Sequence, residues 1–442
     1  MSATGVPVLR WSDLNARARL EAIRRPGERL QQRIFDDAQR IIDEVRRGGD
    51  AALARLTLEL DGARLASFRV SDQEFMQAQQ QLTATQQAAL ARAVANVRRF
   101  HEAQESSALS LEISPGVRCE RFEVPIAAVG LYVPAGSAPL PSTAIMLAVP
   151  AEIAGCPRRI LCTPPRRDGT ADPAVLVAAR LCGVSELFKL GGAQAIAAMA
   201  FGTETVPKVD KVFGPGNAWV GAAKELVASA PGGAARDLPA GPSEVLVIAD
   251  ESARAEFVAA DLLAQAEHSP DAQVLLVTTS VALACAAQVA IDRQRARLER
   301  HAIVDASLRA ARIILVEDLE AAFAVSNAYA PEHLIISVVD ARGWLARVTS
   351  AGSVFLGNWT PEPMGDYCSG TNHVLPTGGA AHAVSGLALA DFTKRITVQE
   401  LTPAGLEDLG PVARTLALLE GLDAHANAVT VRLEALAAGG RP

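Results

Sequence analysis

Short apolar segments alternate with helical segments along residues 124–227, and no other feature of the sequence limits the fold as strongly. The apolar segments are bounded by Gly or Pro, as buried strands are. Strands separated by helices of this length pair in parallel through right-handed crossovers. We therefore predict a parallel sheet with strands at 124–133, 159–162, 186–190 and 211–213 and helices at 143–154, 173–182, 193–200 and 218–227.

The same alternation returns in the second half of the chain. Strands are predicted at 245–249, 274–278 and 313–316, with a helix at 254–267 after the first of them. An apolar run at 334–338 indicates a further buried strand. A second α/β unit is therefore expected, although no residue-level repeat links it to the first.

The segment before the first sheet has a helical pattern. Residues 8–110 are predicted as helices, with Ser12 as a helix N-cap and with Ser71 and Glu74 as a capping box. Breaks are expected at Gly48-Gly49-Asp50 and Asp61-Gly62. We find no chemistry in this segment, and His101 is expected on a helix surface.

Composition excludes several classes of protein. A chain of 442 residues exceeds one ordinary core, and its net charge of −7 gives no basic footprint for nucleic acid or an anionic membrane. No apolar run is long enough to span a bilayer, and the first 20 residues do not resemble a signal peptide. Six cysteines without paired spacing indicate reduced thiols in the cytosol.

Three glycine-containing loops follow strands of the first unit, at 130–136, 191–194 and 214–217. Each allows close approach of the backbone, and two of them open a helix whose N–H groups favour an anion. Ligands of open parallel sheets bind beyond the carboxyl ends of the strands. Each loop alone is a common tight turn and the G-x-G-x-x-G fingerprint is absent, but three in succession favour a nucleotide site.

Two pairs and one loop carry candidate chemistry. Gln265 and His268 are three apart and share a helix face, so they could bind one metal ion, although most such pairs are a solvated helix end. Glu332 and His333 precede a buried strand, where desolvation tunes pKa values towards neutrality. The loop at 365–377 is dense in reactive groups. Its Asp366, together with His425, could complete a zinc site with imidazole and carboxylate ligands.

The order of several long motifs resembles that of the histidinol dehydrogenase family. The likeness extends over residues 10–435. Its motifs are Val129–Thr143, Gly191–Lys224 with its Gly-Pro-Gly-Asn, Ala240–Asp250, Ala264–Asp271, Ala330–Ile336 and Gly357–Leu401. The resemblance implies a cytoplasmic, NAD-dependent zinc enzyme that oxidises L-histidinol to L-histidine through the aldehyde and reduces two NAD per substrate.

The resemblance also implies an architecture. The fold class would be α/β, with two incomplete Rossmann-like parallel-sheet units and additional helical N- and C-terminal parts. The implied domains are a helical N-terminal segment (1–26), a first Rossmann-like domain (27–131 plus 244–382), a second, NAD-binding one (132–243) and a C-terminal helical dimerisation tail (383–442). The implied assembly is a homodimer with intertwined C-terminal parts and one zinc ion per subunit.

Site residues follow from the same resemblance, position by position. Glu332 and His333 match the catalytic acid/base pair. Gln265, His268, Asp366 and His425 match the zinc ligands and, with His333, also contact the substrate. Further substrate positions are Ser243, His373 and Glu420. The NAD positions are Tyr132, Gln194 and Asn217.

The chemistry expected of these groups can be stated physically. A neutral His333 would take the hydroxyl proton as hydride leaves, and Glu332 would activate the water that adds to the aldehyde. Zinc would hold and orient the nitrogen donors of histidinol. A thiohemiacetal on Cys368 is a weaker possibility, because no base is paired with it in sequence. Cys368→Ala is therefore expected to keep most of the activity in an NADH assay, and selective loss of aldehyde oxidation would contradict this.

Two other functions stay open at this point. One is a dehydrogenase of the same family that oxidises a different small alcohol, which would have little use for groups that seat an imidazole. The other is a zinc hydrolase in which Glu332 activates water on an amide. A hydrolase would leave the glycine-containing loops unexplained. Formation of NADH distinguishes a dehydrogenase from a hydrolase.

Overall fold

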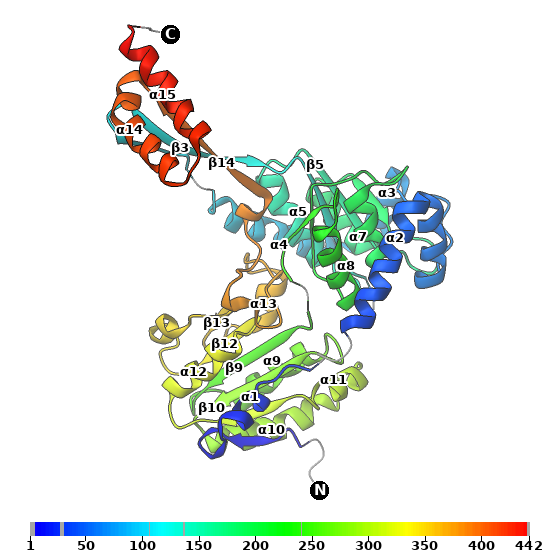
Figure 1. Ribbon diagram of the computed structural model, residues 1–442. Helices are drawn as coiled ribbons and strands as arrows, with labels where there is room; N and C mark the ends of the chain where they lie inside the picture. Colours follow the sequence, from blue (N-terminus) through cyan, green and yellow to red (C-terminus); the bar gives the residue numbers. More distant parts are fainter. Residues whose placement is uncertain (1–4, 27–30, 106, 136–137, 240, 440–442) are drawn as a thin grey trace. The chain divides into compact units, whose positions relative to one another are not determined.

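The computed structural model describes residues 5–26, 31–105, 107–135, 138–239 and 241–439 (Figure 1). The chain divides into two compact units. Unit 1 comprises Met1–Gln104 and Ile126–Phe392, and unit 2 comprises Glu105–Pro125 and Thr393–Pro442. Both α/β sheets lie in unit 1, so the mixed α/β class with parallel sheets is confirmed.

The first sheet of unit 1, sheet B, has five parallel strands. Their order is β6 (Glu186–Lys189), β5 (Arg158–Thr163), β4 (Ala128–Tyr132), β7 (Lys211–Phe213) and β8 (Ala235–Arg236). Between the strands run α5 (Pro141–Ile153), α6 (Pro173–Leu181), α7 (Gly192–Phe201) and α8 (Ala218–Ser229). Apart from β8, which was not predicted, and β4, which begins at Ala128, these elements match the predicted ones closely, because period and breakers agree in each of them.

Helices from the N-terminal part cover both faces of sheet B. The helix α2 (Gln31–Leu56) packs on α7 and α8, while α3 (Asp72–Gln81) packs on α6 and α4 (Ala84–Glu102) on α5. Two apolar clusters fill the two faces. The predicted break at Gly49 is a kink with φ of 51° inside α2, and the predicted Ser71 and Glu74 capping box opens α3.

The second sheet, sheet A, has six parallel strands. Their order is β1 (Val8–Arg10), β11 (Arg312–Leu315), β10 (Gln273–Thr278), β9 (Glu244–Ala249), β12 (His333–Ser337) and β13 (Ser353–Leu356). Its helices are α1 (Ala16–Ala22), α9 (Ala255–Ala266), α10 (Val281–Arg295), α11 (His301–Ser307), α12 (Leu319–Tyr329) and α13 (Glu362–Tyr367). Short turns at Trp11–Asp13, Thr57–Asp61, Gly343–Arg347, Ala380–His382 and Leu389–Phe392 complete the described elements of unit 1.

Sheets A and B share one strand order. In sheet B the first strand, β4, is flanked by the second and third on one side and by the fourth and fifth on the other. In sheet A the strand β9 has the same place, and β1 adds one strand at the edge. Both are therefore Rossmann-like in order. The predicted domain boundaries stay a prediction; that at residues 131/132 falls within β4, which pairs along its whole length in sheet B.

Unit 2 is small and has an antiparallel sheet. The strand β3 (Val117–Pro125) pairs with β2 (Leu109–Ser114) on one side and with β14 (Thr393–Leu401) on the other. The helices α14 (Pro403–Leu419) and α15 (Asp423–Ala437) pack against each other (Figure 1). The C-terminal part is thus helical after one strand.

Four predictions about local structure were wrong. Residues 8–10 form a strand and not a helix. The prediction missed it because three residues are too few to show the alternation of a strand. Asn15, not Ser12, caps the first helix by accepting a hydrogen bond from the N–H of Ala18 at 2.9 Å. His101 is fully buried. The apolar run 124–133 is divided between two sheets at Pro125.

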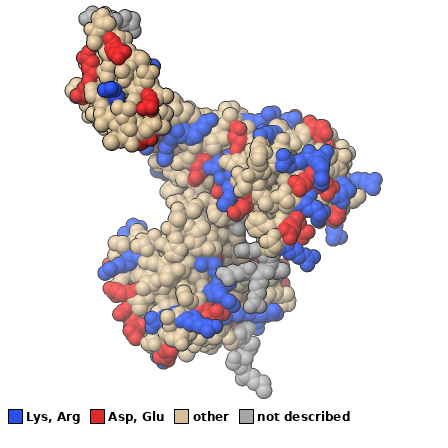
Figure 2. All heavy atoms as spheres, in the orientation of Figure 1, with Lys and Arg blue, Asp and Glu red and all other residues tan. Residues whose placement is uncertain are grey.

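Among the described residues, no helix is long and apolar enough to cross a membrane. On the face visible in Figure 2, acidic and basic side chains are interspersed over the described surface. This face therefore lacks the contiguous basic surface that nucleic-acid binding requires.

Candidate active site

The candidate catalytic residues lie at the amino-terminal edge of sheet A. His333 is the first residue of β12, where it pairs with Val245 of β9 and Ser353 of β13. Because α9 returns antiparallel to β9, its last turn lies at the same edge. This helix ends at Ala266, so Gln265 lies in its last turn and His268 lies just beyond it. The fold therefore brings together residues that are far apart in sequence.

The ring of His333 is held in one orientation. Its Nδ1 lies 3.0 Å from the carbonyl oxygen of Glu244, and the side chain is 3% exposed. An imidazole that donates from Nδ1 to a carbonyl has its lone pair on Nε2 when neutral. Among the described residues, Nε2 has no hydrogen-bond partner. This nitrogen is therefore available as a proton acceptor.

Glu332 is a buried carboxyl group beside this ring. Its Oε2 accepts a hydrogen bond from the N–H of Glu244 at 2.8 Å and lies 3.6 Å from Nδ1 of His333. Burial raises the pKa of Glu332 to about 8. A carboxyl group with this pKa exchanges protons close to neutral pH.

Carboxylates surround the free nitrogen of His333. Asp366 Oδ1 lies 3.5 Å and Glu362 Oε1 lies 3.9 Å from Nε2. Burial alone would lower the pKa of His333, but Glu332, Asp366 and Glu362 outweigh burial and raise this pKa to about 10. The site thus has an excess of negative charge that favours a cation.

A metal ion fits the same cluster. One ligand atom from each of His268, Glu362 and Asp366 lies within 4.8 Å of the others. Glu362 and Asp366 are four apart on α13 and so share a face of it. Gln265 is fully buried in α9, which contacts α13, and neither atom of its amide has a hydrogen-bond partner among the described residues. Imidazole nitrogen with carboxylate and amide oxygens suits zinc.

The two carboxyl groups of α13 have opposite pKa shifts. Burial, together with the charge of Asp366, raises the pKa of Glu362. Burial also acts to raise the pKa of Asp366, but the nearby imidazoles of His333 and His373 outweigh burial and lower it. Asp366 is therefore the ionised member of the pair.

The loop at 365–377 positions His373 beside the cluster. Its first residues, 365–367, belong to α13, so the expectation of a loop throughout was wrong at this end. His373 Nδ1 lies 2.8 Å from the carbonyl oxygen of Asp366, and Nε2 lies 3.2 Å from the hydroxyl of Thr143. Both ring nitrogens are thus engaged by protein groups, and a role for His373 in binding substrate stays a prediction.

The remaining predicted substrate and metal positions divide between the units. Ser243 immediately precedes β9, so it lies at the amino-terminal edge of sheet A in unit 1. Glu420 follows α14 and His425 lies in α15, both in unit 2, and both side chains are exposed. Unit 1 by itself thus supplies three of the four predicted metal ligands.

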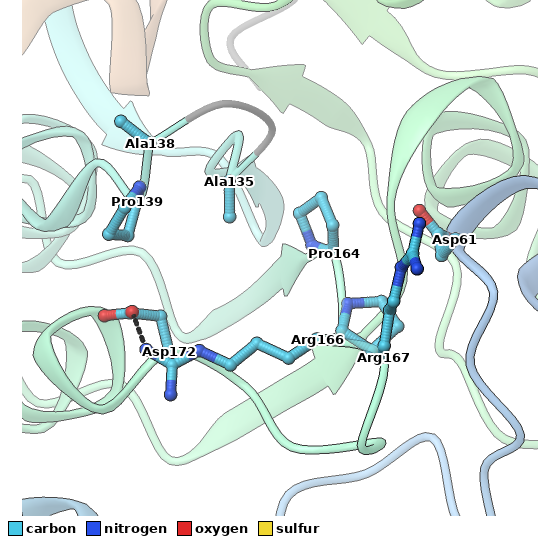
Figure 3. A pocket seen from close by; sticks show the side chains of 9 residues that line it. Asp61, Ala135, Ala138, Pro139, Pro164, Arg166, Arg167 and Asp172 are labelled. Carbon is cyan, nitrogen blue, oxygen red and sulfur yellow. Dashed lines mark hydrogen bonds and ion pairs between the residues drawn. The ribbon is translucent and has the colours of Figure 1, made fainter. Parts of the chain in front are cut away.

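A cleft lies at the carboxyl-terminal edge of sheet B, whereas the cluster around His333 lies at the amino-terminal edge of sheet A. It has a volume of about 390 Å³ (Figure 3). Proline and alanine side chains line part of it, while Arg166 points to Asp172, with which it forms an ion pair. The lining residues follow β4 and β5, except for one from the N-terminal part; they are Asp61, Ala135, Ala138, Pro139, Pro164, Pro165, Arg166, Arg167 and Asp172.

Two of the three predicted NAD positions, Tyr132 and Gln194, lie beside this cleft. The hydroxyl oxygen of Tyr132 accepts a hydrogen bond from the N–H of Gly192 at 2.9 Å. The amide of Gln194 donates to Asp61 Oδ2 at 3.2 Å. Asn217 caps α8 by accepting from the N–H of Val220, also after a strand of sheet B. Gly136, in the first of the predicted loops, lies outside the described residues.

Sequence reasoning missed Asp61 and Glu362. Asp61 was treated as part of a chain break, yet it lines the cleft, and burial raises its pKa to about 6. No local pattern distinguishes it. Glu362 lies between two prolines and was not singled out, although its spacing of four from Asp366 was a usable signal.

Comparison with known proteins gives one consistent family. The sequence profile described as histidinol dehydrogenase matches residues 24–433. The chain is 55% identical to histidinol dehydrogenase of Xanthomonas axonopodis pv. citri (strain 306) over 426 residues, which cover 96% of this chain and 99% of that protein. It is 50% identical to histidinol dehydrogenase of Vibrio vulnificus (strain YJ016), over 97% of this chain and 98% of that one.

A solved structure has the same fold over the whole length. The crystal structure of histidinol dehydrogenase from Elizabethkingia anophelis superposes with a TM-score of 0.93 at 42% sequence identity. The match covers 99% of this chain and all of that one. Sequence and fold therefore point to the same relatives.

Proposed function

The chain belongs to the histidinol dehydrogenase family, an oxidoreductase family, and on this premise we propose that it oxidises L-histidinol to L-histidine through L-histidinal, reducing two NAD per substrate. This reaction forms the last steps of histidine biosynthesis. The observation that supports it best is the unpartnered Nε2 of His333, which lies beside Glu332 and a metal-ligand cluster.

The metal proposed for this site is zinc. Its proposed ligands are Gln265, His268 and Asp366, with His425 as the fourth. When bound, the ion supplies a positive charge that orients the nitrogen donors of the substrate. The unsatisfied amide of Gln265 and the surplus of carboxylates support this assignment.

His333 is proposed as the general base of the first oxidation. Its Nε2 would accept the hydroxyl proton while hydride leaves the neighbouring carbon. With the carboxylates neutralised by a bound dication, the pKa of His333 falls towards its ordinary value, so that the ring is neutral at the start. The hydrogen bond from Nδ1 to Glu244 would keep Nε2 directed at the substrate.

Glu332 is proposed to activate the water that adds to the aldehyde. Its pKa of about 8 suits a group that takes a proton near neutral pH and then releases it. Its position beside His333 puts both groups next to one carbon atom. Ser243, His373 and Glu420 would contact the remaining polar groups of the substrate.

NAD is proposed to bind along the carboxyl edge of sheet B, at Tyr132, Gln194 and Asn217. The cleft beside the first two residues supports this, because ligands of open parallel sheets bind at this edge. Arg166 is paired with Asp172, so Arg167 is the arginine of the lining that would favour an anionic ligand such as a diphosphate.

The assembly is proposed to be a homodimer formed through unit 2. In the described part of unit 2, Val117 and Ala426 are the only buried apolar side chains. A unit with so little core is unstable alone and needs a partner surface. Twelve large apolar side chains there are exposed: Leu109, Leu111, Ile113, Phe122, Ile396, Leu401, Val412, Leu416, Leu418, Leu419, Leu422 and Val431.

The compartment is proposed to be the cytoplasm. All six cysteines are free thiols, and Cys156, Cys162 and Cys182 are buried. Burial raises the pKa of Cys156 to about 11, so this thiol is inert and needs only a reducing environment. The thiol of Cys368 makes no hydrogen bond to a described residue, which supports the expectation that it is not a nucleophile.

The test is to mix the purified protein with L-histidinol and NAD, before and after chelation, and to count NADH formed per histidinol consumed. Two NADH per substrate, lost on chelation and restored by zinc, is the expected result. NADH from another alcohol but not from histidinol would move the substrate to a different small alcohol. No NADH from any alcohol would favour hydrolysis instead.

A further inference from the structure

Glu362 is an enclosed carboxyl group that neither the proton transfer nor the four proposed metal ligands require. It is 1% exposed and lies four residues before Asp366 on α13. Its Oε1 has no hydrogen-bond partner among the described residues. An unpaired polar atom in the interior is unfavourable. The position is therefore built for a donor that arrives with a ligand.

This oxygen lies next to the atom proposed to take the proton. Glu362 Oε1 and His333 Nε2 are 3.9 Å apart, and both are buried without a hydrogen-bond partner in the described part of the chain. One ligand can satisfy both atoms if it has two polar groups on neighbouring atoms. One of these must give up a proton to Nε2, and the other must donate a hydrogen bond to Oε1.

An amino alcohol with its two groups on adjacent carbons meets this requirement. In L-histidinol the amine is on the carbon next to the one with the hydroxyl group. A substrate whose hydroxyl faces His333 can therefore direct its amine to Glu362, because Oε1 is only 3.9 Å from Nε2. An amine keeps N–H groups to donate whether or not a metal takes its lone pair.

Resting on the proposed function, we propose that Glu362 determines specificity by accepting a hydrogen bond from the amino group of the substrate. A carboxyl oxygen that bonds a donor in a dry site rejects the analogue without that donor, because the oxygen is then left unpaired. The chain would thus distinguish amino alcohols from plain alcohols of the same shape through this one group.

The experiment compares Glu362→Ala, which removes the acceptor oxygen, and Glu362→Gln, which keeps one, with the wild type for two ligands. L-Histidinol has the amine, whereas imidazolylpropanol has the same ring and hydroxyl but no amine. Binding of each to the zinc-loaded protein is measured by calorimetry without NAD, and the zinc content of each protein is determined. We expect Glu362→Ala to weaken histidinol binding about tenfold to a hundredfold and to change imidazolylpropanol binding less than about threefold, with full zinc content. Glu362→Gln should keep most of the histidinol affinity, because its amide oxygen still accepts the bond.

Glu267→Ala is the matched control. Glu267 is a partly exposed residue between Gln265 and His268, and the same change there should leave both affinities unaltered. Equal loss for both ligands, or no loss for either, would overturn the proposal. Loss of zinc from Glu362→Ala would also overturn it and make Glu362 a metal ligand. Formation of NADH from histidinol by the wild type is measured separately, so failure of this proposal is distinct from failure of the proposed function.

Discussion

Sheets A and B of unit 1 have the same strand order, yet the side chains proposed to function lie at opposite edges of the two sheets. In sheet B the cleft and Tyr132 lie at the carboxyl ends of the strands, where open parallel sheets bind ligands. In sheet A the cluster around His333 lies at the amino ends. Strand order therefore determines where the loops are, and it does not determine which edge is used for chemistry.

The difference has a local cause. The loops after β4, β6 and β7 are rich in glycine, so the backbone at the carboxyl edge of sheet B is accessible to a ligand. At the amino edge of sheet A, α13 adds two carboxyl groups to the imidazoles of His268 and His333. The carboxyl-terminal edge of sheet B thus has accessible backbone groups beside a cleft, and the amino-terminal edge of sheet A has titratable side chains.

The largest expected effect comes from His333→Asn. Asparagine can still donate to the carbonyl of Glu244 but has no base at the position of Nε2. Oxidation of histidinol should fall about a thousandfold, the contribution typical of a positioned base. NADH binding, followed by fluorescence, should be unchanged, because sheet B is untouched. A parallel loss of NADH binding would break the separation of the two edges.

A smaller effect is expected from Glu332→Gln. Aldehyde oxidation should fall about a hundredfold, and alcohol oxidation much less, because only the aldehyde needs an activated water. Rates with histidinol and with histidinal, each followed at 340 nm, separate the steps. Equal loss of both would argue against Glu332 as the group that activates water.

At the other edge, Gln194→Ala should raise the KM for NAD about tenfold and leave zinc content and histidinol affinity unaltered. The amide of Gln194 bonds Asp61 beside the cleft, and its loss frees that carboxylate. Steady-state kinetics with each substrate varied in turn would measure this. An effect confined to histidinol would place NAD elsewhere.

The smallest effect concerns pH and Asp61. Burial raises the pKa of Asp61 from 3.8 to about 6, so its contribution to stability is complete below pH 3.8 and is lost as pH rises through 6. Asp61→Asn should therefore melt about 2–4 °C above the wild type at pH 8 and show no gain near pH 4. Asp168→Asn is the control, because the hydrogen bonds from Thr170 lower the pKa of Asp168. If the melting temperature of Asp61→Asn rises equally at pH 4 and pH 8, ionisation of Asp61 is not the cause of the gain.

Much of the fold was predictable because local signals agree in it. The strand β9 is apolar from Val245 to Ala249, and α6 begins with a proline and is followed by Gly183. Failures occurred where long-range contacts decide. His101 has a helical context typical of a surface residue, but its Nε2 lies 3.3 Å from the amide of Asn372, which is 271 residues away.

The site was predictable only in part, for a similar reason. Resemblance to a family supplied residue roles that no spacing could give, and the structure brings His268, His333 and Asp366 into one cluster. Asp61 and Glu362 escaped notice because their surroundings come from distant parts of the chain. A carboxylate at a chain break and one at the cleft look identical in sequence.

The pairing of β3 with β14 has a consequence for synthesis of the chain. Residues 126–392, the greater part of unit 1, separate the two strands, so β2 and β3 leave the ribosome long before their partner exists. At about 5–20 residues per second this interval is roughly 13–50 s. During it β3 presents an open edge and β2 presents Leu109, Leu111 and Ile113. The nascent chain thus exposes an aggregation-prone hairpin of β2 and β3 while unit 1 folds. In that interval the chain depends most on chaperones.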